Sequence, residues 1–193
     1  MNIEDILNLL NTYQKQTRET AIYPEIGKKF VYPVLGLVGE IGELLEKFEN
    51  NQTYFAMSNS KNIDTTELEG EIGDVLWYIA RTAEEFGFTM SDLIKDQDCF
   101  VKNIIDIRHS VSQMVIDAGL LSGKVKKIFR DKDGEVSDEV KELIRLYLWN
   151  IFNSLNGLCD KMHINVIDVS EKNIDKLFDR KKRGKIKGDG DNR

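Results

Sequence analysis

The chain has 193 residues and a formal net charge of −6, with 41% apolar and 31% charged residues. This length suits one ordinary domain or two small ones with a buried core, and the negative charge argues against a general nucleic-acid binder. Only two prolines, Pro24 and Pro33, interrupt the chain, which favours helices over a fold of strands and turns.

The sequence shows neither an export signal nor a membrane span. The N-terminus lacks the basic region of a signal peptide, and no apolar run approaches the roughly 18 residues that a spanning helix needs. Cys99 and Cys159 lack metal-ligand spacing, so we expect two reduced thiols. We therefore expect a cytoplasmic protein with no membrane partner.

Apolar residues at helical spacing predict four helices in the first half of the chain. The predicted ranges are 3–20, 33–49, about 65–86 and 91–110. Pro33 suits the first turn of the second helix, Gly87 ends the third, and Thr89 or Ser91 caps the fourth. The fold class is therefore all-α.

The second half reads as a weaker copy of the first. The segment IDAGL stands where GEIGE would be, ELIRLYLWNIF aligns with EGEIGDVLWYIA through the pairs Leu76-Trp77 and Leu148-Trp149, and SEKNIDKL parallels FVKNIIDI. We expect two tandem units, residues 1–108 and 109–193, that form a pseudo-dimer. The alternative is that two amphipathic helix pairs resemble each other through composition alone.

Two repeated motifs in the first half carry carboxylates three residues apart. GEIGE contains Glu40 and Glu43, and GEIGD contains Glu71 and Asp74. Residues i and i+3 lie roughly 5–6 Å apart on one helix face, and both pairs border an apolar stripe. Glycines on the other flank of the second helix (Gly36, Gly39 and Gly42) are expected to let another backbone approach closely.

Two such helices packed side by side bring four carboxylates together, and this cluster would repel itself unless a cation neutralised it. Mg²⁺ suits an all-oxygen site, whereas Zn²⁺ would favour histidine or cysteine ligands, which the cluster lacks. The alternative is a solvated face, because a single ExxE motif on a helix is common. In the second copy Asp117 replaces Glu40, and leucines (Leu120, Leu143 and Leu146) replace the other three acids.

These residues resemble the MazG-like all-α nucleoside triphosphate pyrophosphohydrolases, a superfamily that includes dimeric dUTPases and dCTP pyrophosphatases. The likeness extends over TAIYP, YPVLGLVGEIGELLEKF, ELEGEIGDVLWYIARTAEEFG and the terminal KNIDKLFDRKKRG and GDGDNR, as in the phage and bacterial branch. It implies a MazG-like helical bundle. A typical member is about half as long and dimerises. This chain departs from that pattern, because an insertion separates its family-like first half from its family-like terminal segment.

The resemblance also implies an activity and a set of site residues. The activity is Mg²⁺-dependent hydrolysis of a nucleoside or deoxynucleoside triphosphate to the monophosphate and pyrophosphate, with Mn²⁺ as a substitute, for control of the nucleotide pool. Glu40, Glu43, Glu71 and Asp74 would bind the metal, and Glu43 would act as the catalytic base. The implied substrate-binding residues are Tyr78, Asn103, Lys176, Arg180 and Arg183.

The sequence leaves open other functions and the oligomeric state. The chain could be a non-catalytic nucleotide sensor or a helical interaction protein derived from such enzymes, or could act on an alarmone or a modified nucleotide. The intact acidic quartet favours the enzyme. A fused pair of units could act alone or form a homodimer.

Overall fold

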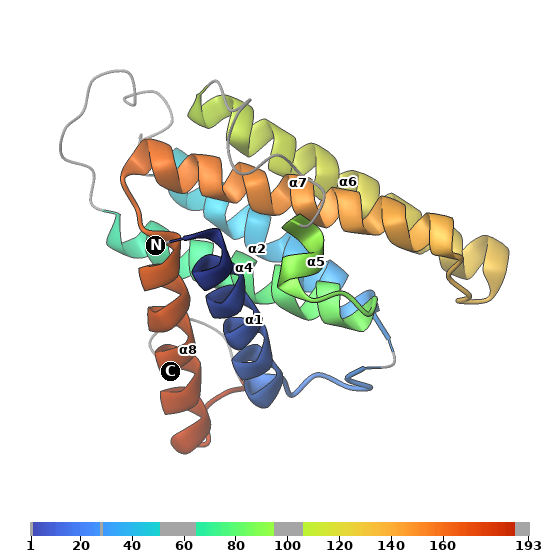
Figure 1. The fold of residues 1–193 in the computed structure, drawn as a ribbon, viewed down its shortest axis with the longest axis horizontal. Helices are drawn as coiled ribbons and strands as arrows, with labels where there is room; N and C mark the ends of the chain where they lie inside the picture. Colours follow the sequence, from blue (N-terminus) through green and yellow to red (C-terminus); the bar gives the residue numbers. More distant parts are fainter. Residues whose placement is uncertain (1, 28, 51–64, 95–105, 188–193) are drawn as a thin grey trace.

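The computed structural model describes residues 2–27, 29–50, 65–94 and 106–187. Within these ranges all regular secondary structure is helical, as predicted (Figure 1). The helices are α1 (Ile3–Thr20), α2 (Val31–Asn50), α4 (Thr66–Glu85), α5 (Met90–Ile94), α6 (Ile107–Lys132), α7 (Asp138–Met162) and α8 (Val166–Lys182). None of these helices is long and apolar enough to cross a membrane.

Short-range polar contacts set several helix ends where the sequence predicted them. At α1, the Asn2 side chain accepts from the Asp5 amide at 2.9 Å while the Asp5 carboxylate accepts from the Asn2 amide at 3.3 Å. After α4, Gly87 takes a left-handed conformation with φ of 84° and ends the helix. Thr89 caps α5, because its hydroxyl oxygen accepts from the Asp92 amide at 3.2 Å.

The prediction of one helix over residues 91–110 was wrong. α5 is described as far as Ile94, and a separate helix, α6, begins at Ile107 and continues to Lys132. Asp106 is extended, with φ of −155°, and its carboxylate accepts from the His109 amide at 2.9 Å. An extended residue whose side chain caps the following turn begins a new helix, so the predicted helix cannot pass through Asp106. Residues 95–105 lie outside the described ranges.

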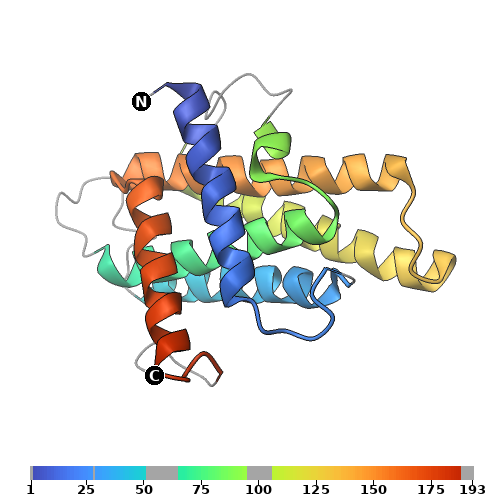
Figure 2. The ribbon, with the colours of Figure 1, turned by 60° about the horizontal axis from the view of Figure 1, so that its bottom comes forward.

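Two antiparallel helix pairs form the centre of the molecule. α2 runs antiparallel to α4, because the Phe30 ring before α2 stacks on the Phe86 ring after α4 with centroids 4.4 Å apart. α6 turns back into α7 through Asp133 and Gly134, both left-handed. The pairs pack together through α2 with α6 and α4 with α7, while α1 and α8 lie side by side across α4 (Figures 1 and 2).

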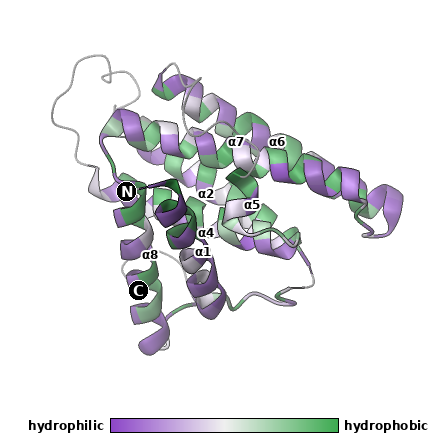
Figure 3. Cartoon of the chain, in the orientation of Figure 1, coloured by the Kyte–Doolittle hydropathy of each residue, from purple (hydrophilic) through white to green (hydrophobic). Residues whose placement is uncertain are grey.

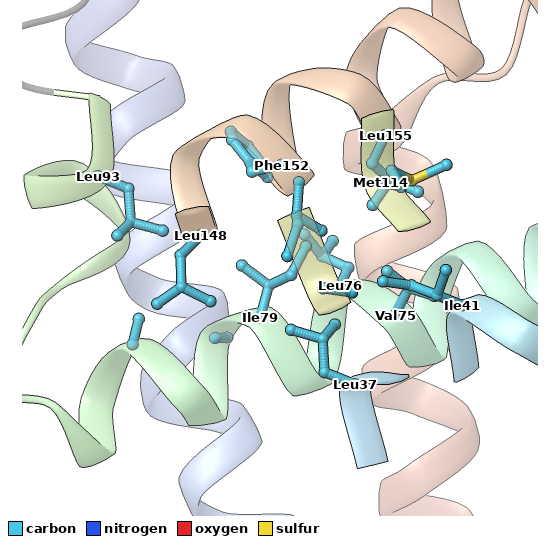
Figure 4. Packing of buried hydrophobic residues seen from close by; sticks show 14 of the residues in the cluster. Leu37, Ile41, Val75, Leu76, Ile79, Leu93, Met114, Leu148, Phe152 and Leu155 are labelled. Carbon is cyan, nitrogen blue, oxygen red and sulfur yellow. The ribbon is translucent and has the colours of Figure 1, made fainter. Parts of the chain in front are cut away.

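The core between these helices is apolar and closely packed. Figure 4 shows side chains from α2, α4, α5, α6 and α7 meeting in one cluster, including the fully buried Leu76 and Leu148 that anchored the sequence alignment. The tip of the α6–α7 hairpin extends beyond this core and is hydrophilic (Figure 3). The core thus fixes α2 and α4 side by side, which is the arrangement that the acidic motifs require.

Candidate active site between α2 and α4

Three predicted metal ligands come together where α2 faces α4. Carboxylate oxygens of Glu40, Glu43 and Glu71 all lie within 4.8 Å of one another. The two glutamates of α2 share one helix face, and Glu71 reaches them from the neighbouring helix. Three converging carboxylates fit a hard divalent cation, which takes oxygen ligands at short distance.

The burial of these carboxylates is graded. Glu71 is 4% exposed, Glu40 is half-buried and Glu43 is exposed. The pKa of Glu40 is raised to about 8, first by burial and then by the neighbouring charges of Asp74, Glu43 and Glu71, while Lys176 opposes the shift. The cluster is therefore short of positive charge, as expected for residues arranged around a cation.

Asp74, the fourth predicted ligand, is not among the three carboxylates that converge within 4.8 Å. Asn173 of α8 donates from Nδ2 to Asp74 Oδ1 at 2.7 Å, and Lys176 Nζ lies 3.0 Å from Oδ1 and 2.8 Å from Oδ2. Tyr13 in turn donates from its hydroxyl to Asn173 Oδ1 at 3.1 Å. α8 therefore brings an amide and an ammonium group to the acidic site, although it lies about a hundred residues further along the chain.

Sequence reasoning chose Asn103 as the substrate-binding asparagine and missed Asn173. Asn103 lies outside the described residues, whereas Asn173 is buried and contacts Asp74. The signal that pointed to Asn173 was the alignment of KNIDKL with KNIIDI, which paired the two asparagines without deciding between them. The side-chain geometry shows that Asn173 lies at the site.

The glycines of the motifs do not have the role that the sequence predicted. A Cβ atom at Gly39, Gly42 or Gly70 would meet nothing within 4 Å. The close approaches occur instead at Gly36 and Gly73. There a Cβ atom would overlap the Tyr78 ring or come within 3.0 Å of Asn173. The prediction of close backbone approach was therefore wrong, because the glycines that matter accommodate side chains.

Tyr78 borders the acidic residues as predicted from its place one turn after Asp74. Its pKa is raised well above the usual value, chiefly by burial and also by Tyr32, Glu40 and Asp74. The ring packs against the main core and against a smaller apolar cluster of Ala21, Tyr23 and Trp77. The acids thus lie beside a second apolar surface as well as beside the main core.

The remaining predicted substrate ligands lie on or after α8 and differ in exposure. Lys176 contacts Asp74, as described above. Arg180 is buried, at 3% exposure. Arg183 is exposed and donates from Nε to Asp179 Oδ2 at 2.7 Å. Lys176 thus contacts the acidic site through Asp74.

The α6–α7 pair holds one buried acid, at the position that the sequence alignment matched with Glu40. Asp117 of α6 is 3% exposed and accepts hydrogen bonds from Gln113 Nε2 at 2.7 Å and from Asn150 Nδ2 at 3.2 Å. Leu120 and Leu146 are exposed. Amide groups therefore satisfy this carboxylate.

Comparison with known proteins agrees with the position of the acidic motifs. The MazG nucleotide pyrophosphohydrolase domain matches residues 33–97, a range that contains all four acids. The gene 37 protein of Mycobacterium phage L5 is 38% identical over 80 residues, which cover 42% of this chain and 70% of the phage protein. This chain belongs to the MazG nucleotide pyrophosphohydrolase family. No solved structure matches it.

Membership of the MazG family gives the chain an enzymatic class. The MazG domain implies hydrolysis of nucleoside triphosphates, and members of the family typically depend on a metal ion. The matched range includes α2 and α4, which carry the three converging carboxylates. The residues present therefore fit the metal that the family implies.

Proposed function

We propose that this protein hydrolyses a nucleoside or deoxynucleoside triphosphate between the α and β phosphorus atoms. The products are the monophosphate and pyrophosphate, and the role is control of the nucleotide pool. The observation that carries the proposal is the convergence of Glu40, Glu43 and Glu71 within 4.8 Å, inside the matched MazG domain. The aromatic surface at Tyr78 and the ammonium of Lys176 border these acids.

In this proposal Glu40, Glu43, Glu71 and Asp74 hold Mg²⁺, for which Mn²⁺ can substitute. A bound divalent ion neutralises phosphate charge and makes a water molecule more acidic. Glu43 is the exposed member of the cluster, so it can accept the proton of the attacking water. Asn173 and Lys176 orient the Asp74 carboxylate through the hydrogen bonds described above.

The proposed substrate contacts follow from charge and exposure. Lys176 is 25% exposed at its side chain, so its ammonium can bind a phosphate oxygen as well as Asp74. Arg183 is an exposed cation at the end of α8; the buried Arg180, and Asn103 outside the described residues, belong to the set through the family resemblance. Tyr78 supplies a ring beside the acids for the sugar or the base.

We also propose that the two helix pairs correspond to the two protomers of a dimeric relative. Support comes from two antiparallel pairs that pack on each other, from the burial of Leu76 and Leu148, and from the burial of Trp77 and Trp149. The first pair keeps the acids. The second keeps the scaffold and satisfies Asp117 with amides, so it serves as the partner surface.

A pyrophosphate-release assay tests the proposed reaction. The substrates are dNTPs, NTPs and alarmones, each with Mg²⁺ or Mn²⁺. We expect turnover of at least one nucleotide, and Glu43→Gln or Asp74→Asn should lower it by about a hundredfold or more while the protein stays folded. Glu46→Gln changes an exposed acid on the same helix and serves as the matched control. A folded wild-type protein that cleaves none of these substrates would contradict the proposal.

A further inference from the structure

Lys47 is a cation of α2 that the proposed reaction does not yet use. It follows Glu43 by four residues and Glu40 by seven, so all three side chains leave the helix on one face. Its Nζ atom lies 3.5 Å from Glu71 Oε1 and 3.9 Å from Glu67 Oε2. Lys47 thus forms an ion pair with a carboxylate of the candidate metal site.

The burial of the two partners is unequal. The Glu71 side chain is 6% exposed and the Lys47 side chain 33% exposed. A buried carboxylate needs a nearby positive charge, and in the absence of a metal ion the lysine supplies it. The Lys47 side chain has a flexible chain of four carbons and is partly exposed to solvent, so its ammonium group can move while the helix stays folded.

Two lysines therefore bracket the acids. Lys176 contacts Asp74 from α8, and Lys47 contacts Glu71 from α2. A divalent ion bound at Glu71 would repel the ammonium of Lys47 and release it. The released group would remain tethered beside the site, where a polyphosphate with several negative charges is its natural partner.

We propose that Lys47 binds the pyrophosphate portion of the substrate, and that Glu71 holds its ammonium until a divalent ion takes that carboxylate. This inference rests on the proposed function, because it presumes that Glu71 binds the metal. It adds a residue that neither the acidic motifs nor the α8 cations identified. The simpler reading is a permanent ion pair that only offsets the charge of Glu71.

Two binding measurements on the full chain separate these readings. The first is Mn²⁺ binding without nucleotide, followed by electron paramagnetic resonance. Lys47→Gln removes the competing ammonium, so we expect Mn²⁺ to bind about threefold tighter than in the wild type. The second is calorimetric binding of inorganic pyrophosphate at saturating Mg²⁺, where the same variant should bind about tenfold more weakly.

Lys172→Gln is the matched control. Lys172 Nζ lies 2.7 Å from Glu69 Oε2 in an ion pair outside the carboxylate cluster, so both affinities should stay within about twofold of the wild type. Lys47→Arg keeps the positive charge and should restore most of the pyrophosphate affinity. Circular dichroism confirms that each variant is folded.

The possible results test separately the role of Lys47, its competition with the metal ion and the metal site itself. If Lys47→Gln lowers pyrophosphate affinity no more than Lys172→Gln does, the role of Lys47 is overturned while the proposed reaction stands. If Mn²⁺ binds more weakly to Lys47→Gln, the ammonium does not compete with the metal and the exchange is overturned. If the wild type binds no Mn²⁺, the metal site of the proposed function fails, and the inference fails with it.

Discussion

The pKa of Glu40 shows the effect of gathering carboxylates on two neighbouring helices. It is half-buried beside Glu43, Glu71 and Asp74, and burial together with these charges raises its pKa to about 8. The pKa of an ordinary glutamate is about 4.3. Between this pH and pH 8, Glu40 is therefore protonated in the folded metal-free protein but ionised in the unfolded chain. By linkage, this residue makes the metal-free protein less stable as pH rises from about 4.5 to 8.

We therefore expect the metal-free protein to lose stability between pH 5 and pH 8 through Glu40. The glutamine of Glu40→Gln cannot ionise, so the stability that Glu40 loses as pH rises is retained. The Tm at pH 8 should therefore be at least about 2 °C above that of the wild type. Thermal melts in EDTA at both pH values measure the change. Glu46→Gln, on the exposed face of α2, should leave the pH dependence as it is. An equal loss in Glu40→Gln and the wild type would contradict the assignment.

At the scale of the element, α2 contains glycines with different roles. Gly36 faces α4, where the Tyr78 ring occupies the space of a side chain. Gly39 lies on the exposed side of the same helix with nothing near its missing Cβ atom. Glycine lowers the stability of a helix interior, so only the first position has a packing reason for it.

The two glycines give a matched pair of substitutions. Gly36→Ala would place a Cβ atom 2.1 Å from the Tyr78 ring, so the ring or the helix must shift, and we expect a loss of about 2 kcal/mol. Gly39→Ala meets no neighbour and should stabilise the protein by up to about 1 kcal/mol through helix propensity. Urea denaturation measures both free energies of unfolding. Equal effects of the two substitutions would show that Tyr78 does not pack on α2 as described.

Whether the sequence predicted a helix end depended on how clearly a short-range contact marked that end. The cap of α1 at Asn2 and the stop of α4 at Gly87 involve residues at most three apart, so the sequence predicted these ends. The start of α6 at Asp106 is also local, but a continuous apolar pattern over residues 91–110 concealed it. Periodicity identifies a helical segment more reliably than it identifies a break within one.

At the scale of the whole molecule, two helix pairs pack on each other within one chain, and under the proposed correspondence this packing takes the place of an association between two chains. α6 and α7 cover α2 and α4, and α8 returns to bring Asn173 and Lys176 to Asp74. Every group that we propose for the first site is therefore supplied by one chain. Under the same proposal, the second pair has leucines at three of the four aligned acidic positions and contributes packing.

This arrangement predicts that activity does not depend on association between chains. We expect the specific activity to stay constant, within about twofold, on dilution across the range where a dimer would dissociate, because dilution separates chains but not covalently linked helix pairs. Light scattering at the same concentrations gives the mass in multiples of 22.2 kDa. A joint fall in activity and mass on dilution would show that a second copy is required.

The sequence by itself determined the helical class, most helix positions and the acids on α2 and α4, because these depend on contacts within a few residues. Helical spacing also predicted that the carboxylates of Glu40, Glu43 and Glu71 come together, as they do within 4.8 Å. Only the tertiary structure decided that Asn173 and Lys176 hold Asp74, and that Gly36 rather than Gly39 lies under Tyr78. Those contacts join residues as many as 102 positions apart, and their geometry follows from how the core orients each helix, which local periodicity does not encode.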